Sequence, residues 1–80
     1  MLNKYENILL KRLLSRKVIY PHHHMQGDNL LGGVRSDELG GMKDALKSLI
    51  RQGLVIYVKK TQNAVAIDRA RLEDIYKLIY

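Results

Sequence analysis

The chain has 80 residues, no cysteine and a formal net charge of +6 at pH 7. This length suits one small domain and excludes a multidomain enzyme, and the lack of cysteine excludes a disulfide framework and favours a reducing, cytoplasmic location. No apolar run reaches the roughly 18–20 residues of a membrane helix, and Lys4 and Glu6 argue against a signal peptide. The positive excess, larger over residues 41–80 than over residues 1–40, favours an anionic partner such as nucleic acid.

The N-terminal segment predicts a helix over residues 3–16. Asn3 is a residue type that caps helices, and Glu6 three positions later completes a capping-box pattern. Arg16 and Lys17 suit the C-terminal end, where cations interact favourably with the helix dipole. The apolar side chains recur at helical spacing: Tyr5, Ile8, Leu9, Leu10, Leu13 and Leu14.

Residues 18–35 give weaker indications of secondary structure than the N-terminal segment. Residues 18–20 are β-prone and form at most a minimal strand, which Pro21 ends. Glycines interrupt the rest of this segment and leave room for a short helix over about residues 28–31, which Asp28 could cap. This segment is therefore expected to be mainly a connection.

A long helix is expected over about residues 36–52. Ser36 suits the cap position, and Asp37 and Glu38 complement the positive end of the helix dipole. Gly53 is a residue type that ends helices. One face is apolar: Leu39, Met42, Leu46, Leu49 and Ile50.

The remaining residues predict a hairpin and a last helix. Two β-prone runs, residues 54–58 and 64–67, flank a polar loop and predict a hairpin over residues 54–67. Asp68 then caps a helix over residues 69–79. Its apolar side should pack on the core: Leu72, Ile75, Tyr76 and Ile79.

The passage from the long helix into the hairpin carries a family resemblance. Residues 45–55, Ala-Leu-Lys-Ser-Leu-Ile-Arg-Gln-Gly-Leu-Val, resemble the helix-to-wing junction of winged-helix proteins, where a helix ending in Leu-x-x-x-Gly runs into the first wing strand. With His24, residues 28–30 (Asp-Asn-Leu) and a Lys-Lys-Thr wing, the chain after residue 18 resembles small archaeal winged-helix proteins. Those proteins usually carry Tyr-Gly in the wing, where this chain has Asn63-Ala64, so a tighter or tilted wing is expected.

The resemblance implies an α+β fold, a winged helix-turn-helix with a three-helix core, a two-stranded β wing and an added C-terminal helix, all in a single domain over residues 1–80. Such domains mostly bind DNA, and some serve only as protein-docking modules. The fold by itself therefore does not choose between these functions.

The outer face of the long helix carries small residues first and cations later. Steps of three and four residues place these side chains opposite the apolar stripe: Ser36, Gly40, Lys43, Lys47 and Arg51. In helix-turn-helix docking, the first turns of this helix enter the major groove and later residues reach phosphates. Base contacts are therefore assigned to Arg35, Ser36 and Gly40. Phosphate contacts are assigned to Lys43 and Lys47.

The expected wing loop offers two cations and three hydrogen-bonding side chains: Lys59, Lys60, Thr61, Gln62 and Asn63. A wing lies beside the duplex backbone or minor groove, where such donors contact phosphate. The other interpretation is a solvated helix face and a polar turn with no ligand. Asp37 and Glu38 favour that interpretation, because they would repel phosphates unless they read a cytosine amine.

The three consecutive histidines suggest a metal site, and the rest of the sequence opposes it. His22 and His24 point the same way in an extended segment, and Asp28 could add an oxygen ligand. A closed zinc site needs four ligands, however, and the chain has no cysteine and no other histidine. No nucleophile–base pair, phosphate loop or catalytic carboxylate pair is recognisable either. We therefore expect no metal, no cofactor and no enzymatic activity.

These observations predict a cytoplasmic domain that binds double-stranded DNA, as a transcription regulator or chromatin-associated factor. The alternative is a winged-helix protein-interaction module that does not bind nucleic acid. A homodimer through the C-terminal helix is also expected, because its apolar surface is too broad for one interface. The side chains assigned to that interface are Tyr76, Leu78 and Tyr80.

Overall fold

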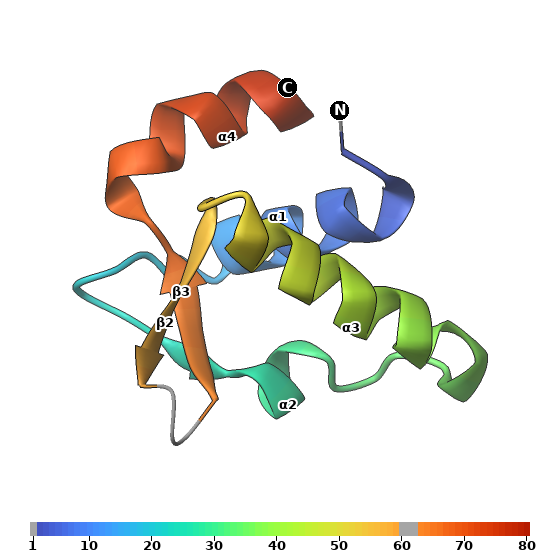
Figure 1. Cartoon of the computed structure of the whole chain (residues 1–80). Helices are drawn as coiled ribbons and strands as arrows, with labels where there is room; N and C mark the ends of the chain where they lie inside the picture. Colours follow the sequence, from blue (N-terminus) through green and yellow to red (C-terminus); the bar gives the residue numbers. More distant parts are fainter. Residues whose placement is uncertain (1, 60–62) are drawn as a thin grey trace.

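The computed structural model describes residues 2–59 and 63–80, with the backbone alone of Lys59. The elements in chain order are α1 (Lys4–Ser15), β1 (Met25–Gln26), α2 (Gly27–Leu30), α3 (Ser36–Arg51), β2 (Val55–Lys59), β3 (Ala64–Ile67), a 3-10 turn η2 (Arg69–Arg71) and α4 (Leu72–Ile79). Figure 1 shows α4 at one end of the molecule and α2 at the other, with α1 and α3 between them. The expected α+β class is confirmed over the described residues.

Helix α1 begins with the expected capping box. The Asn3 side chain accepts a hydrogen bond from the Glu6 backbone N–H at 2.8 Å, and the Glu6 carboxylate accepts one from the Asn3 N–H at 2.9 Å. These two bonds satisfy amides that the first helical turn leaves without a partner inside the helix. The local sequence thus determines where this helix starts.

Glu6 also links α1 to the C-terminal end of α3. Its second carboxylate oxygen accepts hydrogen bonds from Ser48 Oγ at 2.9 Å and Gln52 Nε2 at 2.7 Å. Burial favours the neutral acid, but the bonds from the Asn3 backbone, Ser48 and Gln52 outweigh it, and the pKa of Glu6 lies below its usual value. The buried side chain is therefore held as a carboxylate.

The segment between α1 and α3 contains a strand that the sequence did not suggest. Met25 pairs with Val65 and Gln26 with Ala64, so β1 adds an antiparallel edge to β3. Residues 18–20 form only an isolated parallel bridge, from Ile19. A strand of two residues is too short to show the alternation of apolar and polar residues by which a strand is recognised in a sequence. Only its pairing with β3 identifies β1 as a strand.

Helix α2 starts one residue earlier than expected, and Asp28 does not cap it. Gln26 occupies the cap position without a side-chain hydrogen bond. The Gly27 N–H donates to the Asn63 carbonyl at 2.9 Å, and a Cβ at Gly27 would lie 2.8 Å from Asn63 Nδ2. Close backbone contact with the end of the hairpin therefore fixes this start.

Helix α3 keeps its expected length but not its expected cap. Arg35 is the extended residue before the helix and makes no side-chain cap bond, while Ser36 is already helical. The expected cap at Ser36 is therefore wrong. The C-terminal end agrees with the prediction: Gly53 has φ +79° and the Leu54 N–H returns to the Leu49 carbonyl, which is a Schellman closure.

The sheet has the strand order β1-β3-β2, and both pairings are antiparallel. Every residue of the central strand β3 is buried, whereas Tyr57 on β2 faces outward. After the sheet, Asp68 caps as expected and accepts from the Ala70 N–H at 3.0 Å. The first turn is a 3-10 turn, so the α-helical part of the expected helix over residues 69–79 begins only at Leu72.

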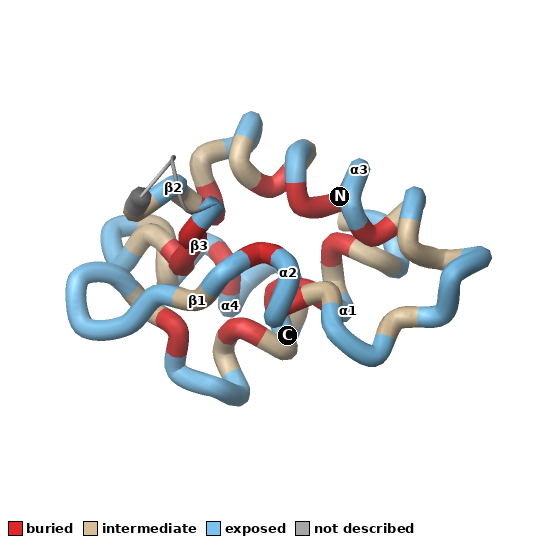
Figure 2. The backbone as a smooth tube through the Cα atoms, turned by 90° about the horizontal axis from the view of Figure 1, so that it is seen from below, coloured by how far each residue is buried: buried red, intermediate tan, exposed pale blue. Residues whose placement is uncertain are grey.

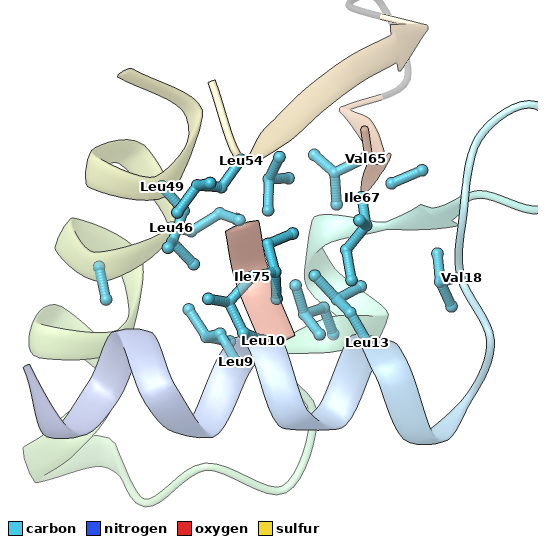
Figure 3. Close-up of a cluster of buried hydrophobic side chains, with 14 of the residues drawn as sticks. Leu9, Leu10, Leu13, Val18, Leu46, Leu49, Leu54, Val65, Ile67 and Ile75 are labelled. Atoms are coloured by element: carbon cyan, nitrogen blue, oxygen red, sulfur yellow. The ribbon is translucent and has the colours of Figure 1, made fainter. Parts of the chain in front are cut away.

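One core joins the helices and the sheet, and Figure 3 labels members of it from α1, α3, β3 and α4. Its largest fully buried side chains come from α1, α2, α3, the sheet with the residue before it, and α4: Leu9, Leu10, Leu13, Leu30, Leu49, Leu54, Val55, Val65, Ile67 and Ile75. On α3 the buried positions are Met42, Ala45, Leu46 and Leu49. Leu39 and Ile50 are only half-buried, and Tyr76 on α4 is exposed rather than part of the core side.

Candidate nucleic-acid interface

The outer face of α3 is exposed, as the spacing of its residues predicted. Its five polar and small residues lie in solvent: Ser36, Gly40, Lys43, Lys47 and Arg51. Figure 2 shows the alternation along α3, with buried positions toward the interior and exposed positions outward. A Cβ at Gly40 would meet no atom within 4 Å, so this glycine leaves an open, flat place on the surface.

The first turn of α3 has its acidic charges balanced by cations. Arg35 Nε lies 3.4 Å from Asp37 Oδ1, and Lys4 Nζ lies 3.8 Å from Glu38 Oε1. Both pairs are exposed and therefore weak. They nevertheless reduce the repulsion that Asp37 and Glu38 would exert on phosphate. They also engage the Arg35 guanidinium, which the sequence assigned to base contacts.

The second half of α3 carries its cations without salt bridges. Among the described residues, no carboxylate lies within 4.0 Å of the charged nitrogens of Lys43, Lys47 or Arg51, although the exposed Asp44 is on the same helix. Helix α3 has three cations and three carboxylates and is neutral overall, but its residues after Gly41 carry all three cations and only one carboxylate, Asp44. These three side chains can each meet an anion without first breaking an ion pair.

A shallow hollow joins this face to the hairpin. Lys43 and Lys47 line it together with Tyr57 of β2, Asn63 at the start of the returning strand, and Asp28 of α2. Tyr57 is 39% exposed, so its ring and hydroxyl are available to a ligand. Tyr57 was not among the residues expected from the sequence, although its place as an outward residue in an otherwise apolar strand was the available signal.

Part of the expected wing lies outside the described residues. This applies to Lys60, Thr61 and Gln62, and to the side chain of Lys59. Asn63 is described and takes a left-handed backbone conformation, with φ +53°, which asparagine tolerates better than most residues. Its carbonyl accepts the bond from Gly27, so the end of the hairpin is fixed against α2.

The histidines lie on an exposed loop after α1. The backbone N–H groups of His22 and His23 both donate to the Ile19 carbonyl at 3.1 Å, which forms a turn. Within residues 2–59 and 63–80, no three His, Cys, Asp or Glu side chains come close enough together to hold a metal ion. No helix in the same residues is long and apolar enough to cross a bilayer.

Helix α4 presents apolar side chains on its outer face. Tyr76 is 47% exposed, Leu78 44% and Tyr80 81%. The Tyr76 and Tyr80 rings stack with 6.0 Å between their centroids. Lys77 is exposed between Tyr76 and Leu78 and its Nζ lies 3.8 Å from Glu73 Oε1, so α4 exposes apolar side chains together with an ion pair.

Comparisons of the chain with protein-family models, with curated proteins and with solved structures found no match. A functional assignment therefore depends on the residues themselves. The most specific arrangement is the cationic second half of α3 beside the hairpin.

Proposed function

We propose that this chain is a winged helix-turn-helix domain that binds double-stranded DNA, as a transcription regulator or chromatin-associated factor. The order α1-β1-α2-α3-β2-β3 and the strand order β1-β3-β2 are compatible with that fold. A short turn with two glycines separates α2 from α3, as in a helix-turn-helix motif. Helix α4 is then an addition to the domain.

The observation that carries the DNA proposal is the hollow between α3 and the hairpin. It brings Lys43 and Lys47, which form no salt bridge with the described residues, beside the outward Tyr57 on one surface. Cations on a helix and donors on a neighbouring hairpin are what a duplex backbone requires. In Figure 1, α2 lies at the end of the molecule away from α4, with the hairpin on one side of it and α3 on the other.

In the proposed complex the first turns of α3 enter the major groove. Ser36 and Gly40 then face base edges, and Arg35 joins them after exchanging its bond to Asp37 for one to a base. Lys43 and Lys47 contact phosphates on the groove edge. The wing cations assigned from the sequence contact phosphate beside them: Lys59 and Lys60.

The test is a salt-titrated binding assay with a labelled duplex of random sequence. Lys43→Gln with Lys47→Gln should lower affinity about tenfold or more at low salt, and flatten the log–log salt dependence by about 0.9 for each lost phosphate contact. Adding Lys59→Ala and Lys60→Ala should lower both values further. A single-stranded DNA of the same length should bind more weakly than the duplex.

The matched control is Lys11→Gln with Arg16→Gln on the exposed side of α1, which removes the same charge. This pair should change affinity much less. Equal losses in both double variants would mean that only net charge matters, and unchanged affinity in the α3 variant would remove the DNA proposal.

We also propose that two copies associate through α4. Helix α4 lies at the end of the molecule away from α2, and the side chains of Tyr76, Leu78 and Tyr80 are exposed. Burying them against a second copy would stabilise a domain this small. A dimer would also present two α3 helices to two half-sites on the duplex.

The same exposed surface of α4 favours the alternative function, a protein-docking module. Under that function the apolar patch binds a different protein and the cations of α3 serve only solubility. The duplex assay distinguishes the two functions. A docking module would bind random DNA no better with the Lys43 and Lys47 charges than in the variant that lacks them.

A further inference from the structure

A second hollow, unrelated to α3 or the hairpin, lies between the end of α1, the loop after it and the start of α4. Its volume is about 490 Å³, within the range of roughly 300–1,000 Å³ that small-molecule sites occupy. Half of its lining residues are apolar or aromatic: Leu14, Ile19, Leu72 and Tyr76. This combination favours a ligand with an apolar body.

The remaining lining residues of this hollow are basic. Lys17 and Arg69 contribute permanent positive charges, and His22 and His23 add imidazoles that donate hydrogen bonds. None of its lining residues, all of which belong to the described part of the chain, is acidic. An anionic head group would therefore meet only attractive charges there.

The backbone at Lys17 gives an independent indication that this position is functional. Lys17 has φ +55° and sits in a Schellman closure, in which its N–H bonds to the Leu14 carbonyl and the next N–H to the Leu13 carbonyl. Helix α3 ends with the same closure and places Gly53 at the equivalent position. Glycine adopts this conformation without the steric cost that a side chain adds. At the end of α1, Lys17 adopts this conformation despite its steric cost, and its side chain lines the hollow.

We propose that this hollow binds a small organic anion with an apolar ring or chain. The Lys17 and Arg69 side chains hold its carboxylate, sulfonate or phosphate head through charge-assisted hydrogen bonds. Leu14, Ile19 and Leu72 cover its apolar body. The site shares no residue with the proposed DNA surface, so it does not depend on that proposal.

The test uses 1-anilinonaphthalene-8-sulfonate, an aromatic anion whose fluorescence rises when its rings leave water. Lys17→Gly with Arg69→Gln should weaken its binding about tenfold. Lys11→Gln with Arg16→Gln, which removes the same charge outside the hollow, should change it less than about twofold. The uncharged N-phenyl-1-naphthylamine should bind the original chain more weakly than the sulfonate does, and should not distinguish the two variants.

Lys17→Gly alone provides a readout that loss of folding cannot imitate. It should raise the Tm, because glycine relieves the left-handed conformation, and at the same time weaken sulfonate binding. Amide chemical shifts on titration should change mainly over residues 14–23 and 69–76. Equal losses of sulfonate binding in both double variants, equal binding of the neutral probe, or chemical-shift changes centred on α3 would each overturn the proposal.

Duplex binding should fall equally in the two double variants. Failure of the anion-site proposal therefore leaves the DNA proposal intact.

Discussion

Helices α3 and α4 each pack one apolar side on the same core, but their outer sides differ in chemistry. The outer side of α3 carries Lys43, Lys47 and Arg51, whereas α4 exposes Tyr76 and Leu78 on either side of Lys77. Packing against the core determines the inner sides of both helices and places no demand on the outer ones. The exposed cations of α3 therefore fit the proposed anionic partner, and the exposed Tyr76 and Leu78 of α4 fit the proposed contact with a second copy.

The largest expected effect is on self-association through α4. Leu78→Glu should lower the dimer association constant about 100-fold, because the interface would bury an unpaired carboxylate. Sedimentation equilibrium at micromolar concentrations should give twice the chain mass for the original protein and 9.2 kDa for the variant. A mass of 9.2 kDa for the original protein at every concentration would contradict the dimer.

The next effect is on the free energy of unfolding, through the hydrogen bonds that join α1 to the end of α3. Glu6→Gln replaces a buried carboxylate that accepts bonds from Asn3, Ser48 and Gln52, and should lower the free energy of unfolding by about 2 kcal/mol. Urea unfolding at pH 7 measures it. Glu73→Gln on the exposed side of α4 is the control, and should change the free energy by less than about 0.5 kcal/mol.

The same substitution predicts a pH dependence. Because the folded-state pKa of Glu6 is lowered, its contribution is complete above the unfolded-state pKa of about 4.3 and is lost as the pH falls through the folded value. The difference in unfolding free energy between the original protein and Glu6→Gln should therefore shrink below about pH 4. A difference that stays constant from pH 7 to pH 3 would show that the carboxylate charge contributes nothing.

A smaller effect on the free energy of unfolding is expected to differ between substitutions of the two adjacent glycines of α3. Gly40→Ala meets open space and should raise the free energy of unfolding by about 0.5–1 kcal/mol. It should nevertheless lower duplex affinity if the backbone at Gly40 approaches the bases. Gly41→Ala places a Cβ 2.8 Å from the Tyr5 ring and should be less stable than Gly40→Ala. Raised stability with unchanged duplex affinity in Gly40→Ala would remove Gly40 from the DNA surface.

The smallest effect tests whether the hollow beside α3 faces the duplex. Asp28 is its single lining carboxylate. Asp28→Asn should therefore raise duplex affinity about twofold, as expected for removal of one exposed repulsive charge. Asp74→Asn on α4 changes the net charge equally and should leave affinity almost unchanged. Equal responses to the two substitutions would place Asp28 away from the DNA.

The sequence predicted those parts of the fold and candidate site that depend on near neighbours. The outward face of α3 followed from spacing alone, because helical geometry places Lys43 and Lys47 on the side opposite Leu46. The sequence did not reveal that Tyr57 shares a hollow with them, since that depends on how the hairpin packs beside α3. Nor did it reveal the second hollow, whose Lys17 and Arg69 lie far apart in the chain.

The sequence by itself determined the capping box at Asn3 and the Schellman end at Gly53, because bonds within a few residues define them, and it determined the hairpin, because two β-prone runs flank one short polar loop. Tertiary structure decided the two-residue strand β1, the start of α2 at Gly27 and the burial of Glu6 as a carboxylate. Their partners are Val65, Asn63, Ser48 and Gln52. These partners lie tens of residues away in sequence, and only the packing of the core brings them within hydrogen-bond distance.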